Sequence, residues 1–250
     1  MYTKAIDLKE FYQSVQGRVV RRVIRHHLKE LWSNVKGQRV LGVGFATPYL
    51  KQFIGEADRV ACMLPMQQGA IFWPRDKDGL VTVCDEGELP IETNSIDKLV
   101  IVHALNSPES IDAVLKEVWR VLVGQGRLII IVPNRSGIWA RIDTTPFGHG
   151  APYSMGQIRH FLKEYNFVPE QERRALFFPP TTSRVMLALA PIFEKIGHRF
   201  FNAFGGVNIV ESSKQLYAGT LVGSASTVKS RKFVTAPGVV SSRNSRKLQR

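Results

Sequence analysis

Cysteine is scarce in this chain: its 250 residues include only Cys62 and Cys84, and both lie in short apolar runs typical of strands. So few thiols exclude a disulfide framework and a zinc site with four thiolate ligands, and we expect no metal site. No apolar run reaches the roughly 18 residues that a membrane-spanning helix needs. The N-terminus also lacks a basic stretch followed by an apolar run and a small-residue cleavage site. We therefore expect a cytoplasmic protein with reduced core thiols and no membrane span.

Acidic residues are missing from two basic stretches of a chain whose net charge is +13. Residues 18–29 hold five lysines and arginines, and residues 229–250 hold seven. Such stretches suit an anionic partner, whether nucleic acid, anionic lipid or an acidic protein, and they are also typical of a solvated helix face and a loose tail. From residue 223 on, Ser, Gly, Lys and Arg dominate without any period, which predicts a disordered basic tail.

Between these stretches, short apolar runs alternate with helical patterns. Apolar residues recur every three or four positions over 8–35, which predicts one N-terminal helix ending at Gly37. Strands are predicted over 39–45, 59–64, 80–84, 96–105 and 127–133, and helices over 48–54, 107–122 and 154–165, the last opened by a capping box of Ser154 and Gln157. Less regular stretches predict strands over 174–178 and 214–221, with a helix over 183–204.

This alternation predicts an α/β fold. Crossovers between successive strands give a Rossmann-like, seven-stranded, mostly parallel sheet flanked by helices. The predicted organisation is an N-terminal helical segment over 1–37, one domain over 38–222 and the tail over 223–250. Within the helix predicted over 183–204, one face carries Phe193, Ile196, Phe200 and Phe204. Because such stripes are more often core than membrane anchors, we interpret this one as core.

The loop at residues 40–48 reads Val-Leu-Gly-Val-Gly-Phe-Ala-Thr-Pro and joins the first strand to a helix. Gly42 and Gly44 permit a tight turn and let a ligand approach the backbone, and the helix start offers free N–H groups to an anion. A dinucleotide site needs a third glycine, where Thr47 stands, and an acid about 20 residues onward. The second strand ends instead at Met63, Leu64 and Pro65. The loop therefore lacks two marks of a dinucleotide site, and a plain strand-to-helix turn is the simpler alternative.

Four further segments carry a resemblance to a known family. Residues 85–90 resemble an Asp-x-x-x-Leu-Pro segment, residues 95–100 a Ser-Phe-Asp-x-Val segment, and residues 117–128 a Glu-x-x-Arg-Val-Leu-x-Pro-Gly-Gly-x-Leu segment. The helix over 154–165 then runs to an Asn-Phe pair where the family often has Gly-Phe. In this order and spacing, residues 38–167 are similar to class I S-adenosylmethionine-dependent methyltransferases, especially the ubiquinone-type, "type 11" group of small-molecule enzymes. That family's first loop has an acid and then three glycines at alternate positions, where this chain has Gly42, Gly44, Ala46 and Pro48.

The resemblance implies S-adenosylmethionine as cofactor and in-line methyl transfer to a small-molecule acceptor. The first loop would line the methionine end, and Asp85 would accept a hydrogen bond from the adenine amino group. No acid stands at the ribose position near Met63, where the amide of Gln67 or Gln68 could substitute. The cofactor contacts implied in this way are Gly42, Gly44, Ala46, Met63, Asp85, Glu86, Leu89 and His103.

Catalytic and substrate contacts are expected where ligands of open α/β sheets gather, at the carboxyl ends of the strands. His103 closes the fourth predicted strand and is a candidate general base, or else a packed and hydrogen-bonded histidine. In the loop after the fifth strand, Trp139 would stack on a planar substrate and Arg135 would bind an anionic group. The expected substrate contacts are Asn106, Asn134, Arg135, Trp139 and Tyr153.

Two other functions compete with a small-molecule enzyme. A non-catalytic binding or regulatory protein would explain the altered glycine loop and the missing ribose acid. A nucleic-acid methyltransferase would explain the basic ends, but enzymes that methylate bases use an Asn/Asp-Pro-Pro-aromatic segment after the fourth strand. This chain has His103, Ala104, Leu105 and Asn106 there.

Overall fold

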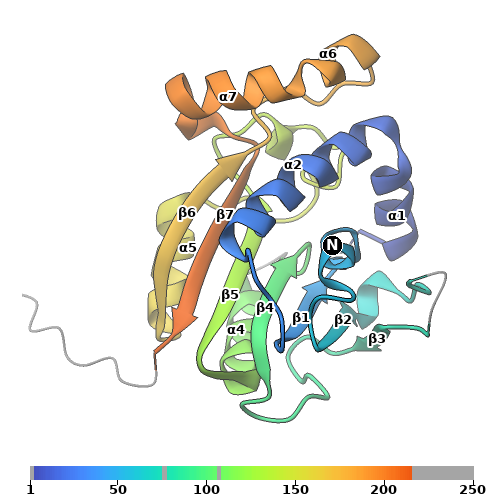
Figure 1. The fold of residues 1–250 in the computed structure, drawn as a ribbon. Helices are drawn as coiled ribbons and strands as arrows, with labels where there is room; N and C mark the ends of the chain where they lie inside the picture. Colours follow the sequence, from blue (N-terminus) through green and yellow to red (C-terminus); the bar gives the residue numbers. More distant parts are fainter. Residues whose placement is uncertain (1–2, 75–77, 106–107, 216–250) are drawn as a thin grey trace, which may run out of the picture. The chain divides into compact units, whose positions relative to one another are not determined.

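Seven strands form one sheet in the order β3-β2-β1-β4-β5-β7-β6. The computed structural model describes residues 3–74, 78–105 and 108–215 (Figure 1). Only β7 runs antiparallel to its neighbours, which confirms the predicted mostly parallel, Rossmann-like sheet. The strands are β1 (Arg39–Gly44), β2 (Arg59–Pro65), β3 (Val81–Cys84), β4 (Ile96–Val102), β5 (Leu122–Pro133), β6 (Phe167–Ala175) and β7 (Val207–Lys214).

Helices cover both faces of this sheet because successive strand side chains point to opposite sides. Val40 packs into a core with α1 (Ala5–Gln13), α2 (Val15–Leu31) and α3 (Thr47–Leu50). Leu41, the next residue, packs into a second core with α4 (Pro108–Val121) and α5 (Met155–Glu164). The N-terminal helices therefore share a core with the strands of the domain predicted to begin at residue 38. The boundary predicted at residue 222 and the tail lie outside the described residues.

The N-terminal helix predicted over 8–35 is two helices. The chain turns at Ser14, whose hydroxyl accepts a hydrogen bond from the backbone N–H of Gly17 at 3.0 Å and so caps the start of α2. A methyl group on Gly17 would lie only 1.9 Å from the carbonyl oxygen of Phe11, so this close turn requires glycine. The capping box predicted at Ser154 is confirmed at the start of α5.

The last two strands were predicted at the wrong positions, because their sequences are polar. β6 is an edge strand with few apolar residues, and β7 buries polar side chains that find partners inside the protein. The carboxylate of Glu211 accepts a hydrogen bond from the indole N–H of Trp32, and the ammonium of Lys214 donates to the carbonyl oxygens of Trp119 and Leu122. Hydrophobic periodicity does not reveal strands of this kind.

The segment between β6 and β7 contains α6 (Arg184–Ala188) and α7 (Ala190–Phe200). β6 is parallel to β5, so these helices lie at the carboxyl edge of the sheet. The connections to α3 and α4 also start at this edge. Within the described residues, no helix is both long and apolar enough to cross a membrane.

Candidate active site

The loop after β1 makes the turn that a backbone-lined ligand site requires. Gly44 has a φ of +76°, in the left-handed region. A methyl group on it would lie 2.1 Å from the carbonyl oxygen of Val102 and 2.8 Å from the Cβ of Ala104. Only glycine fits this position, where the end of β1 lies against the end of β4. The carboxyl ends of β1 and β4 thus meet at the centre of the sheet, where strand order reverses and ligands of such sheets bind.

Two departures from the family's loop occupy the same small space. A methyl group on Gly42 would lie 2.6 Å from the Cβ of Ala46 and 2.7 Å from the Cδ1 of Leu50. The position where the family has an acid is therefore buried, and apolar groups fill the volume its side chain would need. The methionine end of a cofactor would meet backbone groups here and no carboxylate.

At the end of β2, Gln68 occupies the place suggested for a ribose contact. Its side chain is buried, and its Nε2 donates a hydrogen bond to the backbone oxygen of His103. Its Oε1 is buried and has no hydrogen-bond partner within the described part of the chain. Of the two glutamines named from the sequence, Gln67 is exposed. Met63, in contrast, is 6% exposed and packs in the core between the sheet and α4.

At the end of β3, Asp85 is exposed, and its Oδ1 accepts a hydrogen bond from the backbone N–H of Gly87 at 2.8 Å. The following residue, Glu86, is half-buried. Leu89 is buried, and its backbone N–H donates to Glu117, which also pairs with Arg120. Asp85 is thus held in a fixed turn with its carboxylate open to solvent, as an adenine contact requires.

His103 lies in a buried aromatic cluster. Its Nε2 is 2.8 Å from the hydroxyl of Tyr12, which is 2.7 Å from the hydroxyl of Tyr49. The Tyr12 ring stacks on Phe45 of the loop, and the His103 ring packs on Phe147. Burial lowers the pKa of His103 to about 3, so the ring is neutral at physiological pH and is a poor general base. Its surroundings match the packed, hydrogen-bonded alternative.

Three of the expected substrate residues pack inside the domain. The Nδ2 of Asn134 donates to the carbonyl oxygens of Ala203 and Gly205, and the indole N–H of Trp139 donates to that of Phe178 at 2.7 Å. Asn134, Trp139 and Tyr153 are all buried, so no ring face of Trp139 is open for stacking. Arg135 is exposed, and Asn106 lies outside the described residues.

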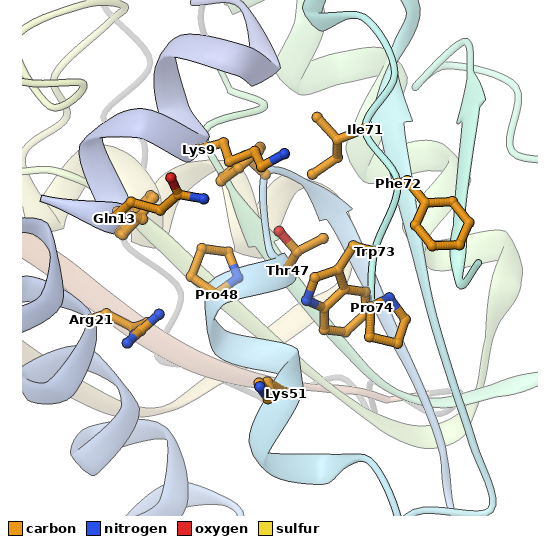
Figure 2. A pocket seen from close by; sticks show the side chains of 12 residues that line it. Lys9, Gln13, Arg21, Thr47, Pro48, Lys51, Ile71, Phe72, Trp73 and Pro74 are labelled. Atoms are coloured by element: carbon orange, nitrogen blue, oxygen red, sulfur yellow. The ribbon is translucent and has the colours of Figure 1, made fainter. Parts of the chain in front are cut away.

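A pocket that the sequence did not indicate lies beside the loop after β1. Its volume is about 270 Å³ (Figure 2). Figure 2 shows Lys9 from α1, Arg21 from α2 and Lys51 after α3 around Thr47 and Pro48. Among the residues that the structure describes, no acid lines this pocket, and none of the three cations forms an ion pair. The remaining wall is aromatic and apolar, formed by Tyr12, Phe45, Ile71, Phe72, Trp73 and Pro74, with Gln13 at one side.

Arg21, one of the three cations of this pocket, also acts on a neighbouring side chain. Burial and the charge of Arg21 lower the pKa of Arg25 from its ordinary value. Arg21 and Lys9 are half-buried, so their charges are only partly screened by solvent. A pocket of this kind suits an anionic group attached to a flat or apolar body.

Comparisons with known proteins agree with the fold. The profile of a methyltransferase domain family matches residues 41–130. No curated protein matches the chain. A methyltransferase from Archaeoglobus fulgidus, described as S-adenosylmethionine-dependent, is 16% identical with a TM-score of 0.54, over 78% of this chain and 94% of that one. A possible histamine N-methyltransferase from Thermotoga maritima is 15% identical with a TM-score of 0.55, over 83% and 94%. The [4+2]-cyclase SpnF is 18% identical with a TM-score of 0.52, over 78% and 80%.

Proposed function

We propose that this chain is a class I S-adenosylmethionine-dependent methyltransferase of the type 11 group, and that it transfers a methyl group to a small anionic acceptor. The profile match over residues 41–130 and the shared fold support this proposal. S-adenosylmethionine is the cofactor of this domain, and when bound it supplies a methyl group activated by a sulfonium. The observation that carries the proposal is the glycine turn at Gly44, which brings the β1 loop onto the end of β4.

The residues present fit the cofactor if an amide takes the place of the ribose acid. The turn at Gly44 would let the amino-acid end approach the backbone of the loop, and Asp85 would accept a hydrogen bond from the adenine amino group. Gln68 would replace the missing ribose acid, because its buried Oε1 is an acceptor without a donor among the described residues. A sugar hydroxyl is a donor of the right kind, and an unpaired buried acceptor costs about 1–3 kcal/mol.

The reaction would rest on alignment and on exclusion of water. His103 remains neutral because burial lowers its pKa to about 3, so it would position Tyr12 and take up no proton. Alignment of a nucleophile with an activated carbon can supply on the order of 7–11 kcal/mol at best. We therefore expect an acceptor atom that is already nucleophilic at neutral pH.

The pocket with Lys9, Arg21 and Lys51 would hold the anionic part of the acceptor. It shares Phe45 and Thr47 with the cofactor loop, so a ligand seated there lies directly beside that loop. Arg21 and the two lysines provide charge for a carboxylate or phosphate, and Trp73 provides a surface for a flat or apolar body.

A non-catalytic binding protein is the second candidate, and the loss of the loop's acid favours it. The acid of the family's loop is absent, and Ala46 and Leu50 fill its space. SpnF, which is described as a cyclase, has a similar fold, so this fold also supports other chemistry.

Calorimetry separates the two candidates. The full chain is titrated with S-adenosylmethionine, with its demethylated product and with a nicotinamide dinucleotide. The enzyme proposal expects saturable binding of the first two ligands and none of the third. If neither the cofactor nor its product binds a folded preparation, the non-catalytic candidate is correct.

A further inference from the structure

Helices α6 and α7 expose a continuous apolar stripe. Val185, Leu189, Ile192, Ile196 and Phe200 are 71%, 39%, 55%, 46% and 69% exposed. They recur at intervals of three or four residues, so they lie on one face of a helix. In Figure 1 the two helices lie across one end of the sheet, with an outer side that faces away from the rest of the domain. We call these five residues the α6–α7 stripe.

The stripe corrects the interpretation of this segment as core. Of the four residues named from the sequence, only Phe193 is even half-buried against the core, while Ile196, Phe200 and Phe204 are exposed. Phe201 and Phe204 extend the apolar surface beyond the end of α7, at 57% and 62% exposure. Single exposed apolar residues are ordinary, but so many large ones in one row are not.

The opposite face of these helices fixes their orientation. Leu187 and Ala190 are buried, and a methyl group on Gly197 would lie 2.3 Å from the Phe177 ring. Glu194 points inward, and its carboxylate accepts hydrogen bonds from the backbone N–H groups of Leu176 and Phe177. Rotation of α7 to bury the stripe would break these contacts, so the stripe faces outward in the folded domain.

Positive charge accompanies the stripe. Arg184, Lys195 and Arg199 are exposed on the same two helices, and none has an ion-pair partner within the described residues. The guanidinium of Arg199 lies 5.8 Å from the centre of the Phe200 ring. Glu194 is the single acid between residues 184 and 204, and it is turned inward.

We propose that the α6–α7 stripe docks on an anionic membrane surface, with its apolar side chains among the lipid headgroups and its basic side chains on the phosphates. An amphipathic helix with one apolar face and basic flanks binds lipid in this way, parallel to the surface. A second copy of the chain fits the stripe less well, because a two-fold interface would bring the same positive charges of both copies together. The stripe lies at the carboxyl edge of the sheet, the edge that also holds the candidate active site.

Vesicle co-sedimentation tests the proposal on the full chain. The probes are vesicles of phosphatidylcholine alone and vesicles of phosphatidylcholine and phosphatidylglycerol in equal parts. We expect binding to the anionic vesicles, and a loss of at least about tenfold in the partition coefficient for the double variant Ile196→Gln/Phe200→Gln. The double variant Lys195→Gln/Arg199→Gln should bind the anionic vesicles more weakly. Its binding should also depend less on phosphatidylglycerol than that of the wild type.

A matched control separates the contribution of the stripe to vesicle binding from non-specific apolar binding and from the contribution of the basic tail. Ile6 on α1 is 53% exposed, close to the exposure of Ile196, and Ile6→Gln should bind vesicles as the wild type does. The melting temperature of each variant checks the fold. Wild-type vesicle binding by the folded Ile196→Gln/Phe200→Gln variant would overturn the proposal. So would light scattering that shows a wild-type dimer and a monomeric double variant, since the stripe would then be a protein interface.

Discussion

Replacement of Gln68 by methionine tests the cofactor site with the least disturbance. Methionine has nearly the same length as glutamine, but it can neither donate to the backbone oxygen of His103 nor accept a hydrogen bond. In the ligand-free protein the change removes one hydrogen bond, worth about 0.5–1.5 kcal/mol, and one unsatisfied buried acceptor, which costs about 1–3 kcal/mol. These effects have opposite signs. The free energy of unfolding should therefore change by between about −0.5 and +2.5 kcal/mol, and Tm should fall by no more than about 2 °C in a chain of this size.

The effect on binding should be larger and of one sign. If Gln68 accepts a hydrogen bond from a ribose hydroxyl, its loss leaves that hydroxyl unpaired in the complex, at a cost of about 1–3 kcal/mol. That cost corresponds to roughly 5- to 150-fold in Kd. The measurement is calorimetric titration with the demethylated product, which avoids turnover, and differential scanning calorimetry of the ligand-free proteins.

Gln67 supplies the matched control because it is the neighbouring residue, of the same type, and exposed. Gln67→Met should leave both affinity and Tm unchanged. An affinity of Gln68→Met equal to that of the wild type would refute the ribose assignment, and a fall of many degrees in its Tm would show that the amide is structural. A wild-type chain that binds neither cofactor nor product would refute the enzyme proposal itself.

Three further predictions concern other parts of the molecule. Gly42→Ala should destabilise the fold by about 1–3 kcal/mol through overpacking, and adding Ala46→Gly should restore most of that loss in denaturant unfolding; additive effects would contradict the shared space. Arg21→Gln should weaken binding of phenyl phosphate in calorimetry, whereas Arg22→Gln, one residue along and lining a different pocket, should not; equal losses would remove the pocket assignment. Burial raises the pKa of Glu194 from 4.5 to about 7. The folded state therefore holds this proton more tightly, and stability should fall as pH rises from 4.5 to 7. In thermal melts Glu194→Gln should lack this part of the decline, and a slope of Tm against pH identical to that of the wild type would show that Glu194 is not its source.

The parts of the fold that local chemistry determines could be predicted from the sequence. Gly44 was expected in a tight strand-to-helix turn, and the capping box at Ser154 needs only two side chains at the correct spacing. Buried parallel strands are nearly continuous apolar runs, so β1, β2, β4 and β5 were found. β7 was misplaced because Glu211 and Lys214 are buried through partners far away in the sequence.

The candidate site was less predictable because its residues depend on tertiary contacts. Trp139 follows the correct strand for a substrate contact, but its indole N–H is taken by Phe178, 39 positions away. The side chain of Gln68 is held by the backbone oxygen of His103, which follows a different strand. The cationic pocket combines Arg21 and Lys51 from separate helical segments, and the signal available in the sequence was only a general excess of basic residues.

The altered glycine loop is better explained by a compensated exchange than by simple decay. At Gly42 a side chain is missing relative to the family's pattern, and at Ala46 one has been added, and the two positions compete for one volume. The turn at Gly44 and its close contact with the end of β4 are present, so the loop has the glycine turn without the carboxylate. The polar side chains left to recognise a cofactor, Gln68 and Asp85, follow β2 and β3, where the ribose and adenine would lie. Recognition would therefore rest on the nucleoside half of the cofactor, with the amino-acid half held by backbone groups alone.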